Sequence, residues 1–375
     1  MEQQKNRRRE GAHASQSLLH KRTPSRRGAM QRLRSLCCAG HDPMMIAPDI
    51  FALLHQLIPS AACAIFLTQP NGMPYAFYHE DSDEGARSLF QNQPQMFLGG
   101  AEHNVFKIVG DASQPKAGGL LRPAVEYYSS NTYQYLVRPS GHHHALEVRL
   151  ETDHVPAGAL MLFREPGCGF SDADIPILNN AARYIEFALK AEFDHSTALE
   201  SIDIDSAMVV ITTDGMPLYM TDMAAQLLQM ISLSHNFWQQ GHVLPVFCLD
   251  VVRQLQAESG LPQSQIAIPE GLLHVRAEWL HGVNQAKAMV ALHLKRVIPK
   301  SLACWRIVQA SDLSPQQADV AFLLVTGIAK PVIRGRLGIS EAVLKDCIKA
   351  IYQCYNVHSM LELVDHVNQE LMQAA

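Results

Sequence analysis

The strongest constraint on this chain is its C-terminal stretch, residues 313–375, which carries start and stop signals for four consecutive helices. Ser314 can cap the first helix, because Pro315 suits the first helical position and Gln317 can complete a capping box. Gly338 can adopt the left-handed conformation that ends a second, shorter helix. The signals predict an all-α unit whose helices are joined by tight turns.

The third predicted helix begins at Ser340 and is amphipathic. Lys345 and Lys349 are four residues apart and therefore project from one face. The apolar residues of this helix form a stripe on another face: Leu344, Ile348, Ile351 and Tyr355. A fourth helix, over about 359–372, carries Leu361, Leu363, Val364, Val367 and Leu371. A short helix, a three-residue turn and an amphipathic helix with a basic face are what a helix-turn-helix needs to enter the major groove of DNA.

These residues resemble the LuxR-type helix-turn-helix family along the whole stretch. The resemblance rests on Leu-Ser-Pro at 313–315, Gly327, Arg-Leu-Gly-Ile-Ser-Glu-Ala at 336–342, Lys345, Ile351-Tyr352, Val357 and Glu362-Leu363-Val364. The chain departs from the family at 330–334, where Asn-Lys-Glu-Ile-Ala is usual. It also departs at Asp346, where an apolar or neutral residue is usual, and at Cys347, where His is frequent.

The resemblance implies a transcriptional regulator of bacterial type. It implies that the third helix reads double-stranded DNA, that residues ahead of it position the DNA backbone, and that the fourth helix pairs two subunits of a homodimer. The residues that it assigns to DNA contact are Lys330, Arg334, Arg336, Ser340, Lys345, Asp346 and Lys349.

The distribution of charge along the chain is uneven. The net charge is −5, but residues 1–35 hold ten Lys or Arg and two Glu, so the remainder carries −13. An acidic body is a poor general binder of polyanions. The modest basic charge of residues 327–352 therefore predicts few phosphate contacts per subunit and a need for dimerisation.

Residues 1–45 are predicted to be a disordered basic tail that contributes nothing to the folded core. Short basic runs such as Arg7-Arg8-Arg9 are separated by Ser, Gly and Ala, which leaves little apolar surface to offset the entropy of ordering. The tail can also be read as an upstream extension that precedes a true start at Met30 or Met44. No apolar segment follows the basic residues, so we do not expect a signal peptide.

Residues 46–195 are expected to form one α/β domain. The predicted elements, in order, are a helix at 51–58, strands at 61–67 and 74–78, a helical aromatic stretch at 122–135, strands at 145–150 and 158–163, and a helix at 172–193. This order resembles a GAF-type sensor domain. The residues most similar to that family are Gly158 to Arg164, followed by Phe170 to Asp174.

Residues 196–300 are expected to form a second, smaller domain. The predicted elements are strands at 207–211 and 218–220, helices at 222–230 and near 246–256, and strands at 272–281 and 287–295. This order resembles a reduced PAS-type domain, in which a sheet and short helices enclose a pocket. Residues 299–311 are expected to be a linker into the helix-turn-helix domain at 301–375. The expected fold is a multidomain α+β chain, with GAF-like and PAS-like α/β sensor domains before an all-α four-helix domain.

The cysteines indicate a reducing compartment. Eight Cys are scattered along 375 residues, with no Cys-x-x-Cys pair and no secretory signal, so we expect reduced thiols in a cytoplasm. No window approaches the roughly eighteen apolar residues that a membrane span needs, so we expect no membrane association.

Candidate metal and catalytic residues are few. The run His142-His143-His144 with His154 lacks a matching Cys, Asp or Glu partner, and we expect loop histidines that bind no metal. Cys168 lies between two glycines, but nothing in the sequence supplies a base for it, so an inert turn residue is expected. Because the common catalytic and phosphate-binding motifs are also missing, we expect neither an enzyme nor a cofactor.

Tyr127, Tyr128, Tyr133 and Tyr135 form an aromatic cluster with two readings. They can line a ligand pocket or fill a core, because sensor pockets and cores use the same residue types.

The function expected from the sequence is sequence-specific DNA binding, controlled by a small molecule or a partner sensed in the N-terminal domains. The competing hypothesis is a protein-interaction module that has a degenerate helix-turn-helix and acts by heterodimerising with another regulator. Asp346 and the acidic body favour that alternative.

Overall fold

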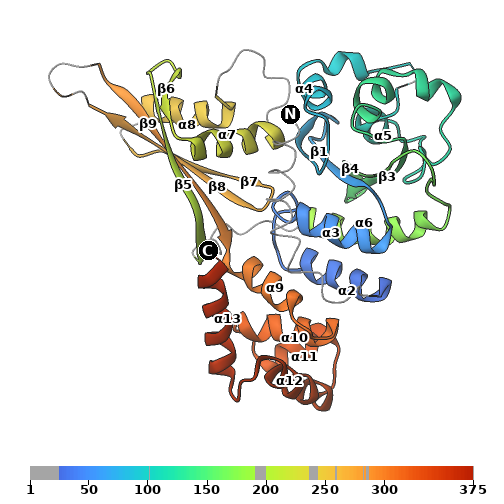
Figure 1. The fold of residues 1–375 in the computed structure, drawn as a ribbon, viewed down its shortest axis with the longest axis vertical. Helices are drawn as coiled ribbons and strands as arrows, with labels where there is room; N and C mark the ends of the chain where they lie inside the picture. Colours follow the sequence, from blue (N-terminus) through green and yellow to red (C-terminus); the bar gives the residue numbers. More distant parts are fainter. Residues whose placement is uncertain are drawn as a thin grey trace. The chain divides into compact units, whose positions relative to one another are not determined.

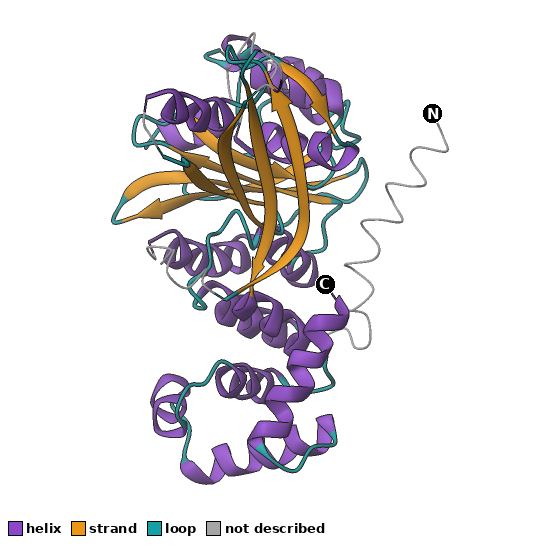
Figure 2. Cartoon of the chain, turned by 90° about the vertical axis from the view of Figure 1, so that its left-hand side faces the viewer, coloured by secondary structure: helices purple, strands orange, loops and turns teal. Residues whose placement is uncertain are grey.

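The computed structural model describes residues 25–100, 102–190, 200–235, 244–257, 260–281, 283 and 287–374. The chain divides into two units. One, here called the two-sheet unit, is Cys37–Ile298, and the other, the helical unit, combines Pro299–Ala375 with the described part of Met1–Leu36 (Figure 1). The chain is a mixed α+β protein with two antiparallel sheets and many helices (Figure 2). None of the described helices is long and apolar enough to cross a membrane.

The first sheet of the two-sheet unit has four antiparallel strands in the order β2-β1-β4-β3. Their bounds are β1 Ala62–Thr68, β2 Pro74–His79, β3 His144–Thr152 and β4 Val155–Arg164. These confirm the four strands expected at 61–67, 74–78, 145–150 and 158–163. The residues of β1 are buried along its whole length, as expected for a continuous apolar run covered on both faces.

Helices cover the first sheet. They are α3 Ala47–Leu57, α4 Glu84–Asn92, α5 Val105–Gly110 and α6 Asp174–Lys190, with shorter helical turns at Pro94–Phe97, Val125–Ser129 and Thr132–Val137. Phe66 and Phe77 of the sheet share one aromatic and aliphatic core with Phe90 of α4 and Ile108 of α5. The sequence predicted α6 over 172–193, and its last three residues lie outside the described part of the chain.

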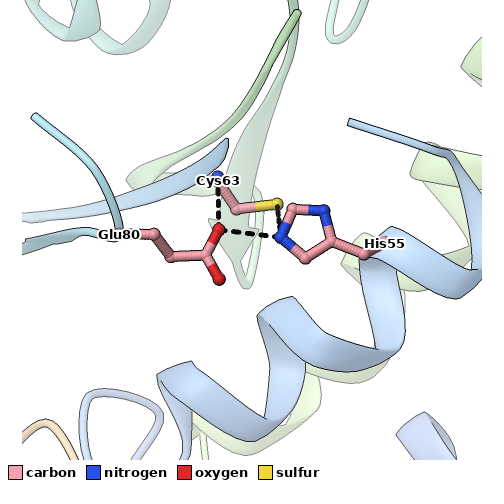
Figure 3. Close-up of side chains that lie close together, drawn as sticks. All are labelled: His55, Cys63 and Glu80. Atoms are coloured by element: carbon pink, nitrogen blue, oxygen red, sulfur yellow. Dashed lines mark hydrogen bonds and ion pairs between the residues drawn. The ribbon is translucent and has the colours of Figure 1, made fainter. Parts of the chain in front are cut away.

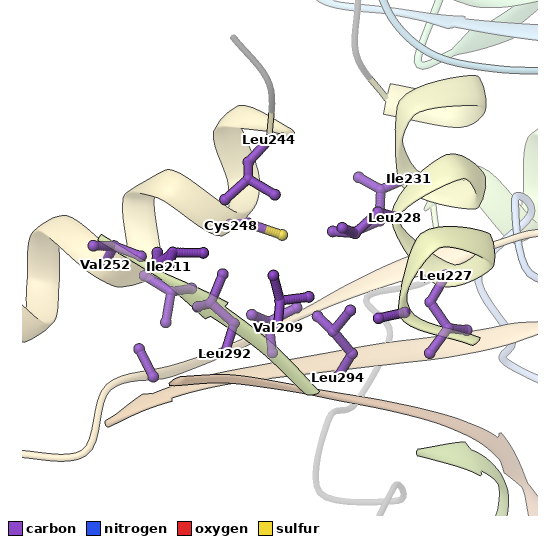
Figure 4. Close-up of a cluster of buried hydrophobic side chains, with 14 of the residues drawn as sticks. Val209, Ile211, Leu227, Leu228, Ile231, Leu244, Cys248, Val252, Leu292 and Leu294 are labelled. Atoms are coloured by element: carbon purple, nitrogen blue, oxygen red, sulfur yellow. The ribbon is translucent and has the colours of Figure 1, made fainter. Parts of the chain in front are cut away.

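The second sheet has five strands in the order β6-β5-β9-β8-β7. The strands are β5 Ser201–Ile211, β6 Pro217–Met220, β7 Gln263–Ile268, β8 Gly271–Leu280 and β9 Met289–Pro299, with helices α7 Asp222–His235 and α8 Val246–Ala257. Thr221 caps α7 as predicted, accepting a hydrogen bond from the backbone N–H of Ala224 at 3.1 Å. Aliphatic side chains of α7 and α8 pack with Val209, Leu292 and Leu294 of the sheet (Figure 4).

The helical unit is built around α10 Pro315–Val325, which packs against each of the other C-terminal helices. These are α9 Lys300–Ala310, α11 Lys330–Leu337, α12 Glu341–Tyr355 and α13 Met360–Ala374. The predicted capping box at the start of α10 is present: the hydroxyl of Ser314 accepts from the backbone of Gln317, whose side chain accepts from the backbone of Ser314. Two predictions about the surroundings of these helices are wrong.

The first error concerns the predicted tail. Residues 1–24 lie outside the described part of the chain, but Arg26–Cys37 form helix α2. Ala29, Leu33 and Leu36 are completely buried. These residues recur every three or four positions and so create one apolar face inside a basic segment. Met44 and Met45 are buried as well, so residues 26–45 are part of the folded protein.

The second error concerns the predicted linker at 299–311. Most of it is α9, a helix that starts directly after Pro299 and buries Leu302, Trp305 and Val308. Their spacing of three residues places them on one helical face, which explains why the segment folds onto its neighbours. Trp305 also donates its indole N–H to the hydroxyl of Ser35 in α2, at 3.4 Å.

Candidate nucleic-acid interface

The turn between α11 and α12 is fixed by backbone geometry at both ends. Gly338 ends α11 in the left-handed conformation, with φ 62° and ψ 35°, as the sequence predicted. The N–H of Ile339 donates to the carbonyl of Arg334 at 3.2 Å. Ser340 then caps α12, its hydroxyl accepting from the backbone N–H of Val343 at 3.3 Å. Three residues therefore set the angle between the two helices.

The inward face of α12 differs slightly from the predicted stripe. Leu344, Cys347, Ile351 and Tyr355 are buried, whereas Ile348 is only half-buried. Cys347 and Ile348 flank the stripe on opposite sides, and the helix is rotated so that the Cys347 side is covered. Helical periodicity alone cannot distinguish these two rotations. The opposite face of α12 is left open to solvent.

All seven residues assigned to DNA contact have exposed side chains in the structure: Lys330, Arg334, Arg336, Ser340, Lys345, Asp346 and Lys349. They lie on α11, on α12 and at the cap between them. None is needed to fill the core, so each is available to a partner. The side chain of Lys345 is 75% exposed, and that of Arg334 is 44% exposed.

Glu341 joins two of these residues and was not singled out from the sequence as a member of the site. One oxygen of its carboxylate lies 2.9 Å from the ammonium of Lys345, and the other lies 3.6 Å from the guanidinium of Arg334. The sequence signal was present, since a Glu four residues before a Lys on a helix forms such a pair. The ammonium of Lys345 and the guanidinium of Arg334 lower the pKa of Glu341, which is therefore ionised at neutral pH.

These ion pairs affect how the surface can bind a polyanion, because Glu341 competes with phosphate for the two basic side chains. Both partners are well exposed, and exposed pairs contribute little because water and salt screen them. A phosphate can therefore compete with Glu341 for Arg334 and Lys345. The arrangement suits an anionic polymer that brings several phosphates at once.

The histidine run does not form one group. His142 is buried and packs against the rings of His79 and Phe163, with centroids 5.4 and 5.0 Å away, and those two rings also contact each other at 5.2 Å. His143 stacks on Tyr128 at 5.4 Å. His154 is exposed at the turn between β3 and β4, with a φ of 66°. His143 also contacts the ring of His144 edge to face at 4.6 Å, so these two side chains lie together, whereas His142 and His154 have other surroundings.

The tyrosine cluster belongs mainly to the core. Tyr127 and Tyr133 are buried and pack edge to face at 5.6 Å, and both are part of the aromatic core under the first sheet. Tyr135 points outward and is about half-exposed. Of the two readings of the cluster, core filling describes Tyr127 and Tyr133.

Cys168 lies in the loop between β4 and α6. Its side chain is exposed, and its thiol is 3.8 Å from the carbonyl oxygen of the adjacent Gly169. This local contact is that of a turn residue.

A cavity of about 360 Å³ opens beside α5 in the two-sheet unit. It is lined by Phe97, Leu98, Gly99, Gly100, Glu102, Asn104, Phe106, Lys107, Gly110 and Asp111. Several of its polar groups are engaged within the protein: Glu102 accepts from the backbone of Asn131 at 2.7 Å, and Asn104 donates to the carbonyl of Phe97 at 2.9 Å. Its size suits a small molecule.

Comparison with known proteins does not show which family the chain belongs to. No protein-family model matches it, and no curated protein matches it in sequence. Among solved structures, the phage VqmA–DPO complex is similar with 16% identity and a TM-score of 0.23, over 44% of this chain and 81% of that one. The E. coli DhaR(N)–DhaL complex is similar with 13% identity and a TM-score of 0.22, over 72% and 86%. Likeness this slight assigns neither a fold family nor a function.

Proposed function

We propose that this chain is a sequence-specific DNA-binding transcriptional regulator. The observation that carries the proposal is the pair α11 and α12, joined by a capped turn of three residues, with apolar residues buried on one side and seven polar or charged residues exposed on the other. In this reading the pair is a helix-turn-helix of LuxR type, and α12 is the helix that enters the major groove. The resemblance in sequence supports the same assignment. We propose no catalytic activity.

Dimerisation is proposed through α13. Its inner side chains Leu363 and Val367 are fully buried, whereas Leu361 and Met372 are 71% and 80% exposed. Leu361 and Met372 are roughly three turns apart, so they lie on one face of the helix. A second copy of α13 would cover that face and would place two α12 helices against one DNA duplex. Each subunit has few basic residues and can make few phosphate contacts, and a dimer doubles the number of contacts.

Control is proposed to come from the two-sheet unit, as a GAF-like and a PAS-like sensor. The cavity beside α5 is the candidate place for a small-molecule effector. An effector that binds one conformation of the regulator better than another would shift the population of DNA-binding dimers.

The second candidate is a protein-interaction module, and Glu341 favours it. This carboxylate holds Arg334 and Lys345, and Asp346 adds a further exposed negative charge beside Lys345. In that case the same surface would bind a second regulator and would leave DNA contact to the partner.

A salt titration with the folded, full-length protein separates the two functions. A DNA-binding dimer should bind duplex genomic fragments, with the logarithm of its affinity falling by about 0.9 per phosphate contact for each logarithm unit of salt. Absence of duplex binding at low salt would contradict the DNA-binding proposal and leave the interaction module as the better account.

Asp346→Val is expected to tighten binding to duplex DNA of any sequence. The substitution removes an exposed negative charge beside Lys345 that repels phosphates. We expect a gain of a few-fold at low salt that shrinks as salt rises and screens the charge. The matched control is Asp250→Val, which removes an exposed aspartate from α8. An equal gain in both variants would show that the effect comes from net charge and not from this surface.

A further inference from the structure

Three side chains with metal-binding atoms converge at the edge of the first sheet. His55 lies on α3, Cys63 on β1, and Glu80 directly after β2. One nitrogen of His55, Nε2, is 2.8 Å from a carboxylate oxygen of Glu80 and 4.0 Å from the sulfur of Cys63. The three atoms all lie within 4.8 Å of one another (Figure 3). This is the one such group of three found among the described residues.

The pairing of β1 with β2 places two of the three ligands. Ala64 pairs with His79, so Cys63 and Glu80 stand opposite each other, and the N–H of Glu80 donates to the carbonyl of Cys63 at 3.1 Å. Directly opposite residues of an antiparallel pair point to the same face of the sheet. The N–H of Cys63 donates to the carboxylate of Glu80 at 2.7 Å, which holds that carboxylate beside Cys63.

Ser60 orients the third ligand. Its hydroxyl donates to the carbonyl of Ile58 at 3.2 Å and lies 2.8 Å from Nδ1 of His55. The hydroxyl also lies 3.8 Å from the sulfur of Cys63, and it can accept a hydrogen bond from Nδ1 of His55. In the structure, Nε2 donates to the carboxylate of Glu80 at 2.8 Å; in a metal complex the ring proton would move to Nδ1, where Ser60 accepts it, and Nε2 would coordinate the ion. A polar group that fixes a histidine from its far nitrogen is the usual support of a metal ligand.

A nucleophilic cysteine explains this geometry less well. In a cysteine–histidine–carboxylate relay, one ring nitrogen faces the sulfur and the other faces the carboxylate. Here Nε2 faces both, and Nδ1 faces Ser60. Burial raises the pKa of the Cys63 thiol, and the charge of Glu80 raises it further, so the thiol is a poor nucleophile without a cation.

We propose that His55, Cys63 and Glu80 bind one Zn²⁺ ion per chain, with water in a fourth position. Tetrahedral zinc holds nitrogen and oxygen ligands at about 2.0–2.2 Å and sulfur at about 2.3 Å, which separates the ligand atoms by roughly 3.4–3.6 Å. The separations of 2.8 and 4.0 Å from Nε2 bracket that value, and the sulfur of Cys63 and the oxygen of Glu80 lie within 4.8 Å of each other, so shifts of the side chains alone can bring the three atoms to coordination distance.

The burial of the three side chains suits such a site. Cys63 is completely buried, whereas the side chains of His55 and Glu80 are 29% and 23% exposed. An ion can therefore enter from the histidine and carboxylate side and meet the sulfur at the bottom. On binding, the thiol gives its proton to water and coordinates as a thiolate. The ion would tie α3 to the two strands.

This site departs from the expectation of no metal. The spacings of eight and seventeen residues match no metal motif, because the three ligands come from a helix and two strands that meet only in the folded domain. The proposal does not depend on DNA binding.

Titration with Co²⁺, a spectroscopic stand-in for Zn²⁺, tests the proposal on reduced full-length protein freed of metal with a chelator. We expect one equivalent to bind, with the visible bands of four-coordinate Co²⁺ and a near-ultraviolet band from thiolate to metal, and we expect Zn²⁺ to displace it. Cys63→Ser should abolish the thiolate band. Ser60→Ala, which removes only the support of His55, should weaken binding by about 10–100-fold.

Cys63 is fully buried, so its substitution can destabilise the fold; His55→Ala and Glu80→Gln therefore provide the second test, at partly exposed positions. Both should keep native circular dichroism and weaken Co²⁺ binding at least tenfold. Cys168→Ser and His154→Ala, at exposed positions elsewhere, should bind as the parent does. The proposal is overturned if the parent shows no thiolate band, or if the band and the affinity persist in His55→Ala and Glu80→Gln.

Discussion

Leu33→Ala is expected to lower the free energy of unfolding by about 2–5 kcal/mol, the usual range for removing most of a fully buried leucine. Leu33 has no exposed surface and sits at the centre of the apolar face of α2, between Ala29 and Leu36. Leu33 lies in a basic segment whose composition alone predicts a disordered tail.

Removing α2 entirely should have a larger effect, because the helix also supplies polar partners to the helical unit. Gln31 donates to the carboxylate of Asp319 in α10 at 3.0 Å, and Ser35 accepts from Trp305 in α9. Asp319 is only 8% exposed, and burial raises the pKa of its carboxyl. A chain that begins after Leu36 would leave this carboxyl without its hydrogen bonds from the amide of Gln31 and the hydroxyl of Ser35, which is costly in a buried place.

The measurement is chemical or thermal unfolding of the parent, of Leu33→Ala and of the chain without α2, followed by circular dichroism. Arg27→Ala is the matched control, since Arg27 lies on the same helix with an exposed side chain and should change stability by less than about 0.5 kcal/mol. If Leu33→Ala and the chain without α2 both unfold at the same denaturant concentration or temperature as the parent protein, α2 is not part of the folded core.

Replacing Lys345 and Lys349 by alanine is expected to have the largest effect on DNA binding. Each lysine that reads a base should contribute about 1–3 kcal/mol, so a double variant that loses two such contacts should lose about 2–6 kcal/mol, or about 30-fold to about 20,000-fold in affinity for its preferred sites. Folding should be unaffected, because both side chains are exposed on the face of α12 opposite the buried stripe. A lysine that contacts only phosphate would weaken binding equally for all sequences and lower the salt slope by about one.

Lys190→Ala is the control for the loss of one positive charge, since Lys190 is exposed at the end of α6. It should leave the affinity almost unchanged. A double variant that binds its sites as the parent does, with native helix content, would mean that α12 is not the reading helix.

Local chemistry predicted the helices of the C-terminal unit well. Ser314 and Gln317 form the capping box, and Gly338 ends α11 with a positive φ, because caps depend on residues close together in sequence. The exposure of the seven candidate DNA contacts follows from the same periodicity. The rotation of α12 that buries Cys347 and leaves Ile348 half-open depends on packing, and periodicity left it undetermined.

The misses have a common cause. In α2 and α9, apolar residues at helical spacing lie in segments whose average composition suggests a tail or a linker. Whether such a segment is helical depends on the tertiary packing of its apolar face. Strand β7 was not anticipated either, because its residues are mostly half-buried and polar in part. The three converging side chains at His55, Cys63 and Glu80 depend on strand pairing, which short-range patterns do not specify.

Selection of binding sites from random duplex DNA tests the central claim most directly. The parent protein and the Lys345→Ala/Lys349→Ala variant would each be carried through the same selection at one salt concentration. The account predicts that the parent enriches one motif built from two half-sites related by two-fold symmetry, and that the double variant loses the preference at one or two positions in each half-site. Enrichment of no motif by the folded parent, or of the same motif by both proteins, would contradict it.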